Sequence, residues 1–299
     1  MTASRPRADL VPLPHIAYEA LVRSALLEDL GLGGDVTSEA TVPQHTFARA
    51  TLVARKPGVL AGLDVALSAF RALDANARCD ASLADGASFA AHATLAHIES
   101  DARALLGAER TALNLLTHLC GIATATARYV EATGGARCAI VETRKTLPGL
   151  RALEKYAVRA GGGSNHRLRL DDAILIKDNH VALAGGVRIA LARARARAGH
   201  LVKIEIEVDT LAQLDDVLAS DARPDVVLLD NFTIEDTREA VRRVAGRVLV
   251  EASGSIGLQD VPALAAAGVD VISVGALTHS VVAIDIGLDI RGPDAVKSA

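Results

Sequence analysis

The stretch VKIEIEVDTLAQLDDVLASDARPDVVLLD, residues 202–230, holds one full repeat of the pattern that decides the fold. A short run over 202–206, in which apolar and charged residues alternate, is followed by a helical segment, and a continuous apolar run covers 226–229. Short runs of this kind are typical of strands that are buried on both faces. A strand, a helix and a strand in this order predict a parallel βα unit.

The same alternation extends on both sides of this stretch, over most of the second half of the chain. Successive runs lie roughly 22 to 35 residues apart, which is the size of a βα unit. A series of such units predicts an α/β fold with parallel strands inside and helices outside, as in a (β/α) barrel or a relative of it. We expect six strands, at 138–141, 173–176, 202–206, 226–229, 248–250 and 269–274.

The first part of the chain has a different rhythm. A helix is expected over 16–30, and a second helix over 63–73. Short apolar runs between 48 and 100 are broken by Lys-Pro-Gly and Asp-Gly turns, which predicts a small α+β domain. A long helical pattern follows over 102–133, with a break expected near Gly121.

Composition limits the class of function. The 299 residues carry a net charge of −4 and only 2% aromatic residues, which argues against a basic module that binds nucleic acid. The longest uncharged stretch, 111–127, is too polar to span a membrane. The start of the chain lacks the apolar core of a signal peptide, so we expect a cytoplasmic protein. Any binding of anions must come from a local cluster of cations.

Such a cluster lies at the ends of the expected strands, which in barrels meet at the active site. Arg144 and Lys145 follow the first of the six strands, and Lys177 follows the second. His166 and Arg167 come between them, after a run of three glycines. Arg binds carboxylate or phosphate through two hydrogen bonds, while Lys acts as a point charge. Since unpaired cations at such a position are costly, the cluster predicts a ligand with several negative charges.

Acidic residues follow the next strands. Lys203, Glu205 and Glu207 alternate with apolar residues, which puts them on one face of a strand, directed into the barrel. Internal ion pairs would explain Lys203 and Glu205. Glu207 lies nearest the mouth and Asp230 ends the following strand, so these two are the better ligands for Mg²⁺ or for the hydroxyl groups of a sugar.

The remaining polar positions allow two interpretations. The last two strands end in small residues, at Ser253-Gly254 and at Gly275, and such turns either bind phosphate through backbone N–H groups or bind nothing. Exposed charge is the simpler explanation for Arg151 and Arg169. Arg110 lies in the long helix, where an exposed ion pair is the default, and the pattern gives it no role.

Nine segments in this order are highly specific in combination. They are 28–30 (EDL), 34–38 (GDVTS), 109–114 (ERTALN), 121–124 (GIAT), 143–151 (TRKTLPGLR), 161–167 (GGGSNHR), 175–180 (LIKDNH), 228–231 (LLDN) and 274–280 (VGALTHS). Through them the chain resembles the quinolinate phosphoribosyltransferase family, from the first helix to nearly the last residue. Small departures include Ser255, where Gly or Asn is commoner, and Cys120, where Ser is expected.

The resemblance implies a fold and a reaction. The fold is an incomplete (β/α) barrel of about six parallel strands, residues 118–280, with an N-terminal α+β sandwich domain formed by 1–117 and 281–299. The reaction is that of a pentosyltransferase, in which quinolinate and phosphoribosyl pyrophosphate give nicotinate mononucleotide, pyrophosphate and CO₂ with Mg²⁺, in de novo NAD synthesis. The alternative is a pyrophosphorylase-like enzyme of molybdenum transport operons, which would differ at the carboxylate clamp.

The resemblance also implies residue roles. The residues expected to hold quinolinate are Arg144, His166, Arg167 and Lys177. Lys145 would lie between the substrates and, with Glu207 and Asp230, form the catalytic set; Glu207 and Asp230 would also bind the ribose and Mg²⁺. The residues expected to cradle the 5′-phosphate are Ser253, Gly254 and Gly275, and Thr143 and His279 complete the substrate-binding set. Arg110 would reach into a neighbouring subunit's site, which implies a homodimer or a larger assembly.

Overall fold

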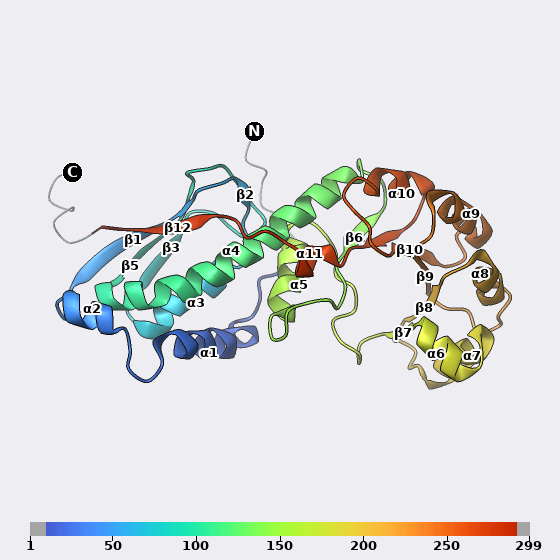
Figure 1. Cartoon of the computed structure of the whole chain (residues 1–299), viewed down its shortest axis with the longest axis horizontal. Coiled ribbons are helices and arrows are strands. Elements are labelled where there is room, and N and C mark those ends of the chain that lie inside the picture. Colours follow the sequence, from blue (N-terminus) through green and yellow to red (C-terminus); the bar gives the residue numbers. More distant parts are fainter. Residues whose placement is uncertain (1–9, 292–299) are drawn as a thin grey trace. The chain divides into compact units, whose positions relative to one another are not determined.

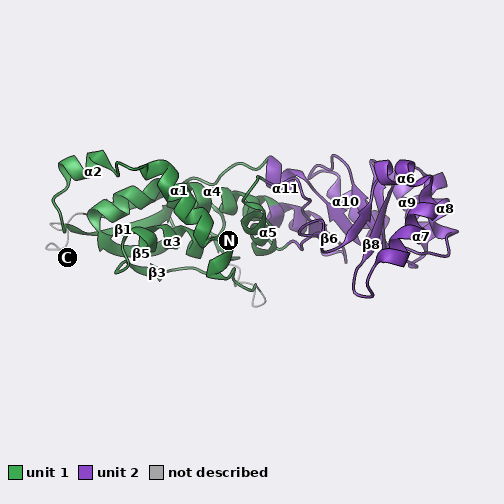
Figure 2. Ribbon diagram, turned by 90° about the horizontal axis from the view of Figure 1, so that it is seen from below, with its two compact units in different colours: residues 1–125, 147–162, 280–299 green, residues 126–146, 163–279 purple. Residues whose placement is uncertain are grey.

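The computed structural model describes residues 10–291, which form two compact units (Figure 2). Within the described residues, the first unit comprises 10–125, 147–162 and 280–291, and the second comprises 126–146 and 163–279. These units differ from the predicted domains mainly at 147–162, which carries helix α5. The ends of the predicted first domain, 1–9 and 292–299, lie outside the described residues.

The first unit is built on a four-stranded antiparallel sheet in the order β12-β1-β5-β3. In Figure 1 the red strand β12 lies beside the blue strand β1, so the last described strand pairs with the first strand of the chain in one sheet. Alternate residues of β1 are buried, which is the pattern of a sheet with one face on the core. The strands of this unit, including the small pair β2-β4, are β1 (Phe47–Ala54), β2 (Gly58–Val59), β3 (Arg78–Ala81), β4 (Ser88–Phe89), β5 (Thr94–Asp101) and β12 (Ile286–Arg291).

The first unit contains both of the short helices that were expected from the sequence. The helix expected over 63–73 has those bounds, and the one expected over 16–30 starts three residues later and ends as predicted. The helices that begin in this unit are η1 (His15–Ala17, a 3₁₀ helix), α1 (Glu19–Leu30), α2 (Val36–Thr41), α3 (Leu63–Leu73), α4 (Ala102–Ala132) and α5 (Arg151–Ala160). None of the helices over 10–291 is long and apolar enough to cross a membrane.

The break expected near Gly121 is wrong. Helix α4 runs through this position without interruption. A Cβ atom at Gly121 would lie 2.5 Å from the carbonyl oxygen of Val282. The glycine is therefore explained by close backbone packing, which a sequence pattern cannot distinguish from a helix break.

The second unit contains the six expected strands in one parallel sheet, in the order β6-β11-β10-β9-β8-β7. Among residues 10–291, the end strands β6 and β7 each pair with one other strand of the sheet and not with each other, so the barrel is incomplete. The strands are β6 (Ala139–Val141), β7 (Ile174–Ile176), β8 (Ile204–Val208), β9 (Val226–Asp230), β10 (Leu249–Ser253) and β11 (Val271–Ser273). Figure 1 shows α7 to α10 on the outer side of this sheet. The helices are α6 (Asp178–Ala184), α7 (Val187–Arg197), α8 (Leu211–Leu218), α9 (Ile234–Val244), α10 (Val261–Ala267) and α11 (Ala276–His279).

Local chemistry accounts for these βα units, as α9 illustrates. The Thr233 hydroxyl accepts the backbone N–H of Asp236 at 3.1 Å and caps the start of the helix. Thr237, Ala240 and Val244 are buried at helical spacing. This pattern turns one face of the helix towards the sheet.

Candidate active site

The carboxyl ends of the six parallel strands line a cavity of about 970 Å³, which lies wholly in the second unit. Twelve predicted site residues line it: Thr143, Arg144, Lys145, His166, Arg167, Lys177, Glu207, Asp230, Ser253, Gly254, Gly275 and His279. Arg169 is exposed and is not among the lining residues. Arg110 and Arg151 belong to the first unit, with Arg110 exposed on helix α4.

Two arginines give the cavity its strongest positive charge. Arg144 follows β6, and Arg167 lies in the segment between α5 and β7, where its guanidinium donates to the Ala173 carbonyl at 3.2 Å. The pKa of Arg167 is lowered by burial and then by the charge of Arg144. The Nε of Arg144 is buried and has no hydrogen-bond partner among residues 10–291. Since unpaired buried donors and like charges are both costly, an anion would stabilise this pair.

Lys177 directly follows β7 and forms an ion pair with Glu207 of β8. The Lys177 side chain is 47% exposed, whereas that of Glu207 is only 8% exposed. A buried carboxylate is costly without a partner, so Lys177 neutralises Glu207 in this arrangement. Any cation that binds Glu207 must compete with Lys177.

A second group of carboxylates lies at the mouth of the barrel. Ligand atoms of Glu207, Asp209 and Asp230 lie within 4.8 Å of one another. An all-oxygen set of this kind suits a hard cation such as Mg²⁺ rather than a metal that prefers sulfur or nitrogen ligands. Asp209 was not predicted, although it continues the alternation of Glu205 and Glu207 by two residues and lies just beyond β8.

The turn after β10 requires a glycine. Gly254 has a φ of +99°, and a Cβ atom there would lie 2.2 Å from Oδ1 of Asn231. Ser255, the departure from the commoner Gly or Asn, has a φ of +48°. This is the left-handed region that Gly and Asn adopt most easily, so the family preference has a conformational reason. At Gly275 a Cβ atom would lie 3.1 Å from Cδ of Lys145, which makes that position tight but not forbidden.

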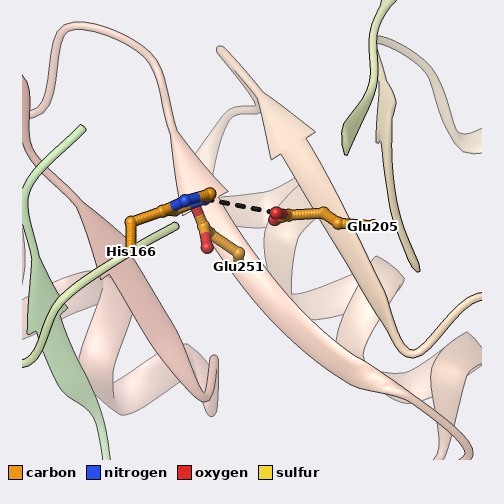
Figure 3. Close-up of side chains that lie close together, drawn as sticks. All are labelled: His166, Glu205 and Glu251. Atoms are coloured by element: carbon orange, nitrogen blue, oxygen red, sulfur yellow. Dashed lines mark ion pairs between the residues drawn. The ribbon is translucent and has the colours of Figure 1, made fainter. Parts of the chain in front are cut away.

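His166 lies between two buried carboxylates of the barrel interior (Figure 3). Its Nε2 is 3.2 Å from Oε2 of Glu205 in β8 and 3.6 Å from Oε1 of Glu251 in β10. Burial, and then the charge of Glu205, raises the pKa of Glu251 to about 8, although the charge of His166 opposes the shift. Internal ion pairs were one interpretation of Lys203 and Glu205. Glu205 contacts His166 in the barrel interior, but Lys203 pairs with Asp225 at 2.8 Å through a side chain that is 74% exposed, so the interpretation is wrong for Lys203. Glu251 directly follows the strand expected at 248–250 and lies within β10, but the pattern gave it no role.

The chain matches two family models that together cover most of its length. "Quinolinate phosphoribosyl transferase, N-terminal domain" matches residues 35–120, and "Quinolinate phosphoribosyl transferase, C-terminal domain" matches residues 122–289. The second match contains every residue that lines the cavity.

Similar proteins carry names that agree with these models. The nicotinate-nucleotide pyrophosphorylase (carboxylating) of Mycobacterium leprae (strain TN) is 50% identical over 277 residues, which are 90% of this chain and 95% of that protein. The probable nicotinate-nucleotide pyrophosphorylase (carboxylating) of Bacillus subtilis (strain 168) is 41% identical, over 92% of this chain and 94% of that protein. Among solved structures, NadC from Streptococcus pyogenes superposes with a TM-score of 0.90 at 38% identity, over 94% of this chain and 99% of that one.

Proposed function

The chain belongs to the quinolinate phosphoribosyltransferase family, and we propose how the side chains of its barrel cavity divide that family's reaction among them. The chain is a pentosyltransferase of NAD biosynthesis, a nicotinate-nucleotide pyrophosphorylase (carboxylating). It joins quinolinate to the phosphoribosyl group and releases pyrophosphate and CO₂. The alternative, an enzyme of molybdenum transport operons, is not favoured, because the relatives carry the carboxylating name.

The pair of Arg144 and Arg167 carries the assignment of the quinolinate side. The charge of Arg144 lowers the pKa of Arg167, and two neighbouring guanidinium groups match a ligand with two adjacent carboxylates. Lys177 supplies a third positive charge from the end of β7. Quinolinate has the two carboxylates, and nicotinate has only one, so this clamp selects for the dicarboxylate.

The opposite side of the cavity is assigned to the sugar phosphate. Backbone N–H groups of the turns at Ser253-Gly254 and Gly275 would hold the 5′-phosphate. Glu207 and Asp230, with Asp209 beside them, would hold Mg²⁺, which neutralises charge on the departing pyrophosphate. The donor set fits this ion, because all three groups are carboxylates at the mouth of the barrel.

Lys145 connects the two sides. Its stem lies against Gly275, next to the phosphate turn, while its chain neighbour Arg144 faces the quinolinate side. From this position the ammonium group would stabilise negative charge near the bond that breaks. Positioning and charge complementarity supply most of the rate in such a displacement, and no side-chain nucleophile is required.

The assay is quinolinate-dependent release of pyrophosphate and CO₂ by the purified protein in the presence of Mg²⁺. We expect nicotinate to be a far poorer substrate, because it lacks the carboxylate that the second arginine would bind. Comparable kcat/KM values for nicotinate and quinolinate would refute the arginine clamp. Activity that is unaffected by removal of divalent cations would refute the metal assignment.

We also propose a homodimer or a larger assembly in which Arg110 completes the site of a neighbouring subunit. Arg110 is exposed on α4, and the family resemblance of the segment 109–114 supports this role. Mixing the inactive variants Arg110→Ala and Arg144→Ala should restore activity, because hybrid dimers have one intact site. No recovery after proven subunit exchange would refute the shared site. We place the enzyme in the cytoplasm, with which its three unpaired cysteines agree.

A further inference from the structure

Three buried glutamates surround the segment that carries Arg167. Glu142, at the end of β6, is fully buried, and its carboxylate accepts the backbone N–H of His166 at 3.2 Å and the Asn165 amide at 3.0 Å. Glu205 and Glu251 face the ring of His166 from β8 and β10. A segment without regular secondary structure is therefore held by carboxylates from three strands of the barrel.

Both ring nitrogens of His166 already have partners. The backbone N–H of Arg167 donates to Nδ1 at 2.7 Å, so Nδ1 must present a lone pair and carries no proton. The ring proton is then on Nε2, which lies 3.2 Å from Oε2 of Glu205. A neutral ring held in this way cannot offer an N–H group to a substrate carboxylate without breaking one of these contacts.

The two carboxylates themselves require one further proton. Oε1 of Glu205 and Oε1 of Glu251 are buried without a hydrogen-bond partner in the described part of the chain. The Ser273 hydroxyl acts to lower the pKa of Glu251, but it does not reach ordinary hydrogen-bond geometry. Two buried carboxylates this close cannot both remain charged, and the raised pKa of Glu251 identifies it as the one that keeps the proton.

We propose that Glu251 and Glu205 are positioning residues for quinolinate, because they hold His166 in its Nε2–H tautomer and thereby fix the backbone of Arg167. Protonated Glu251 can donate to Glu205, Glu205 accepts from Nε2 of His166, and Nδ1 of His166 accepts from the Arg167 N–H. The chain of contacts ends at the residue whose guanidinium faces the cavity. His166 thus acts through Arg167 rather than as a charged ligand. The inference rests on the proposed function.

Two substitutions of Glu251 separate this role from simple packing. Glu251→Gln keeps the length, the neutral charge and a hydrogen-bond donor, whereas Glu251→Met keeps only the length. We expect Glu251→Met to raise KM for quinolinate at least about tenfold and Glu251→Gln to raise it less than about threefold, with KM for phosphoribosyl pyrophosphate nearly constant in both. Asp85→Leu removes a buried, hydrogen-bonded carboxylate from the first unit and is the matched control. It should lower thermal stability without changing the ratio of the two KM values.

The outcomes distinguish this inference from the function on which it rests. A wild-type protein without quinolinate-dependent pyrophosphate release would refute the function itself. An active wild type whose Glu251→Gln and Glu251→Met variants show the same KM for quinolinate would refute only the positioning role. An equal rise in both KM values would also refute it, because that result indicates general disruption of the site.

A measurement on the wild type does not depend on the folding of any variant. Long-range proton–nitrogen NMR of protein with ¹⁵N-labelled histidine reports the protonation of each ring nitrogen, and the His166 signals are assigned by their loss in His166→Asn. We expect Nε2 to carry the proton and Nδ1 to be an acceptor near neutral pH. A doubly protonated ring, or a proton on Nδ1, would overturn the proposal.

Discussion

Replacing Gly254 by alanine tests the geometry of the proposed phosphate turn. At a φ of +99°, any L-residue costs about 1–2 kcal/mol of the free energy of unfolding. The added Cβ would also lie 2.2 Å from Oδ1 of Asn231 and 2.8 Å from its backbone nitrogen. Because a backbone atom cannot move away cheaply, the collision adds about 1–3 kcal/mol. We therefore expect Gly254→Ala to lose about 2–5 kcal/mol in total.

Gly268→Ala is a matched control in the same unit. Gly268 has a nearly equal φ of +91°, but the closest atom to its added Cβ would be Cγ1 of Val241 at an ordinary 3.5 Å. This variant should lose only the conformational penalty of about 1–2 kcal/mol. Urea-induced unfolding of the two variants and the wild type, followed by circular dichroism, measures the difference.

Kinetics separate the functional effect from the structural one. If the turn holds the 5′-phosphate, its displacement in Gly254→Ala should raise KM for phosphoribosyl pyrophosphate by about ten- to a hundredfold, because hydrogen bonds to a charged group are lost. Gly268→Ala should leave this KM unchanged. Equal losses of stability in the two variants, together with equal KM values, would refute the argument from the collision.

Three further predictions concern titration, metal competition and a buried hydrogen bond. Native Glu251 has a pKa of about 8, whereas an ordinary glutamate carboxyl has a pKa near 4.5, so the wild type should lose stability relative to Glu251→Gln as the pH rises between these values. A stability difference between the two proteins that stays constant with pH contradicts this. Lys177→Met should weaken quinolinate binding but raise the affinity of the free enzyme for Mn²⁺, because Lys177 no longer pairs with Glu207. Electron paramagnetic resonance measures the Mn²⁺ affinity, and an unchanged value contradicts the competition. Tyr156→Phe removes the hydroxyl that donates to buried Asp85 at 2.7 Å, so urea unfolding should show a loss of about 1–3 kcal/mol in the free energy of unfolding, with unchanged KM values. A loss below about 0.5 kcal/mol contradicts the role of this hydrogen bond.

The six strands of the barrel were predictable because most of them are short apolar runs with a polar end. The bounds were less so. The strand expected over 202–206 lies at Ile204–Val208, because apolar Val202 extends the run whereas the observed pairing with β7 begins at Ile204. Hydrophobicity records burial, and it does not record where backbone pairing begins.

The cavity residues were predictable for a similar reason, and their interactions were not. Lys177 directly follows β7, Asp230 ends β9 and Arg144 lies three residues beyond β6, so their position at the carboxyl ends follows from chain order. The environment of His166 depends on Glu205 and Glu251. These two glutamates lie on different strands, 39 and 85 residues after His166 in the chain. Nothing in local sequence records a contact between such distant residues, and the tautomer of His166 follows only from the contacts in the folded structure.

Strand β8 carries Glu205 and Glu207 on one face, at two depths of the barrel. The deeper glutamate meets His166 and the outer one lies with the metal-binding carboxylates. Since side chains alternate along a strand, one inserted or deleted residue would turn both glutamates outward and bring Ile204 and Ile206 inward. Substitutions can change the two positions separately, but a shift of register removes both together. During divergence of this enzyme, β8 should therefore accept changes of residue type and exclude changes of length.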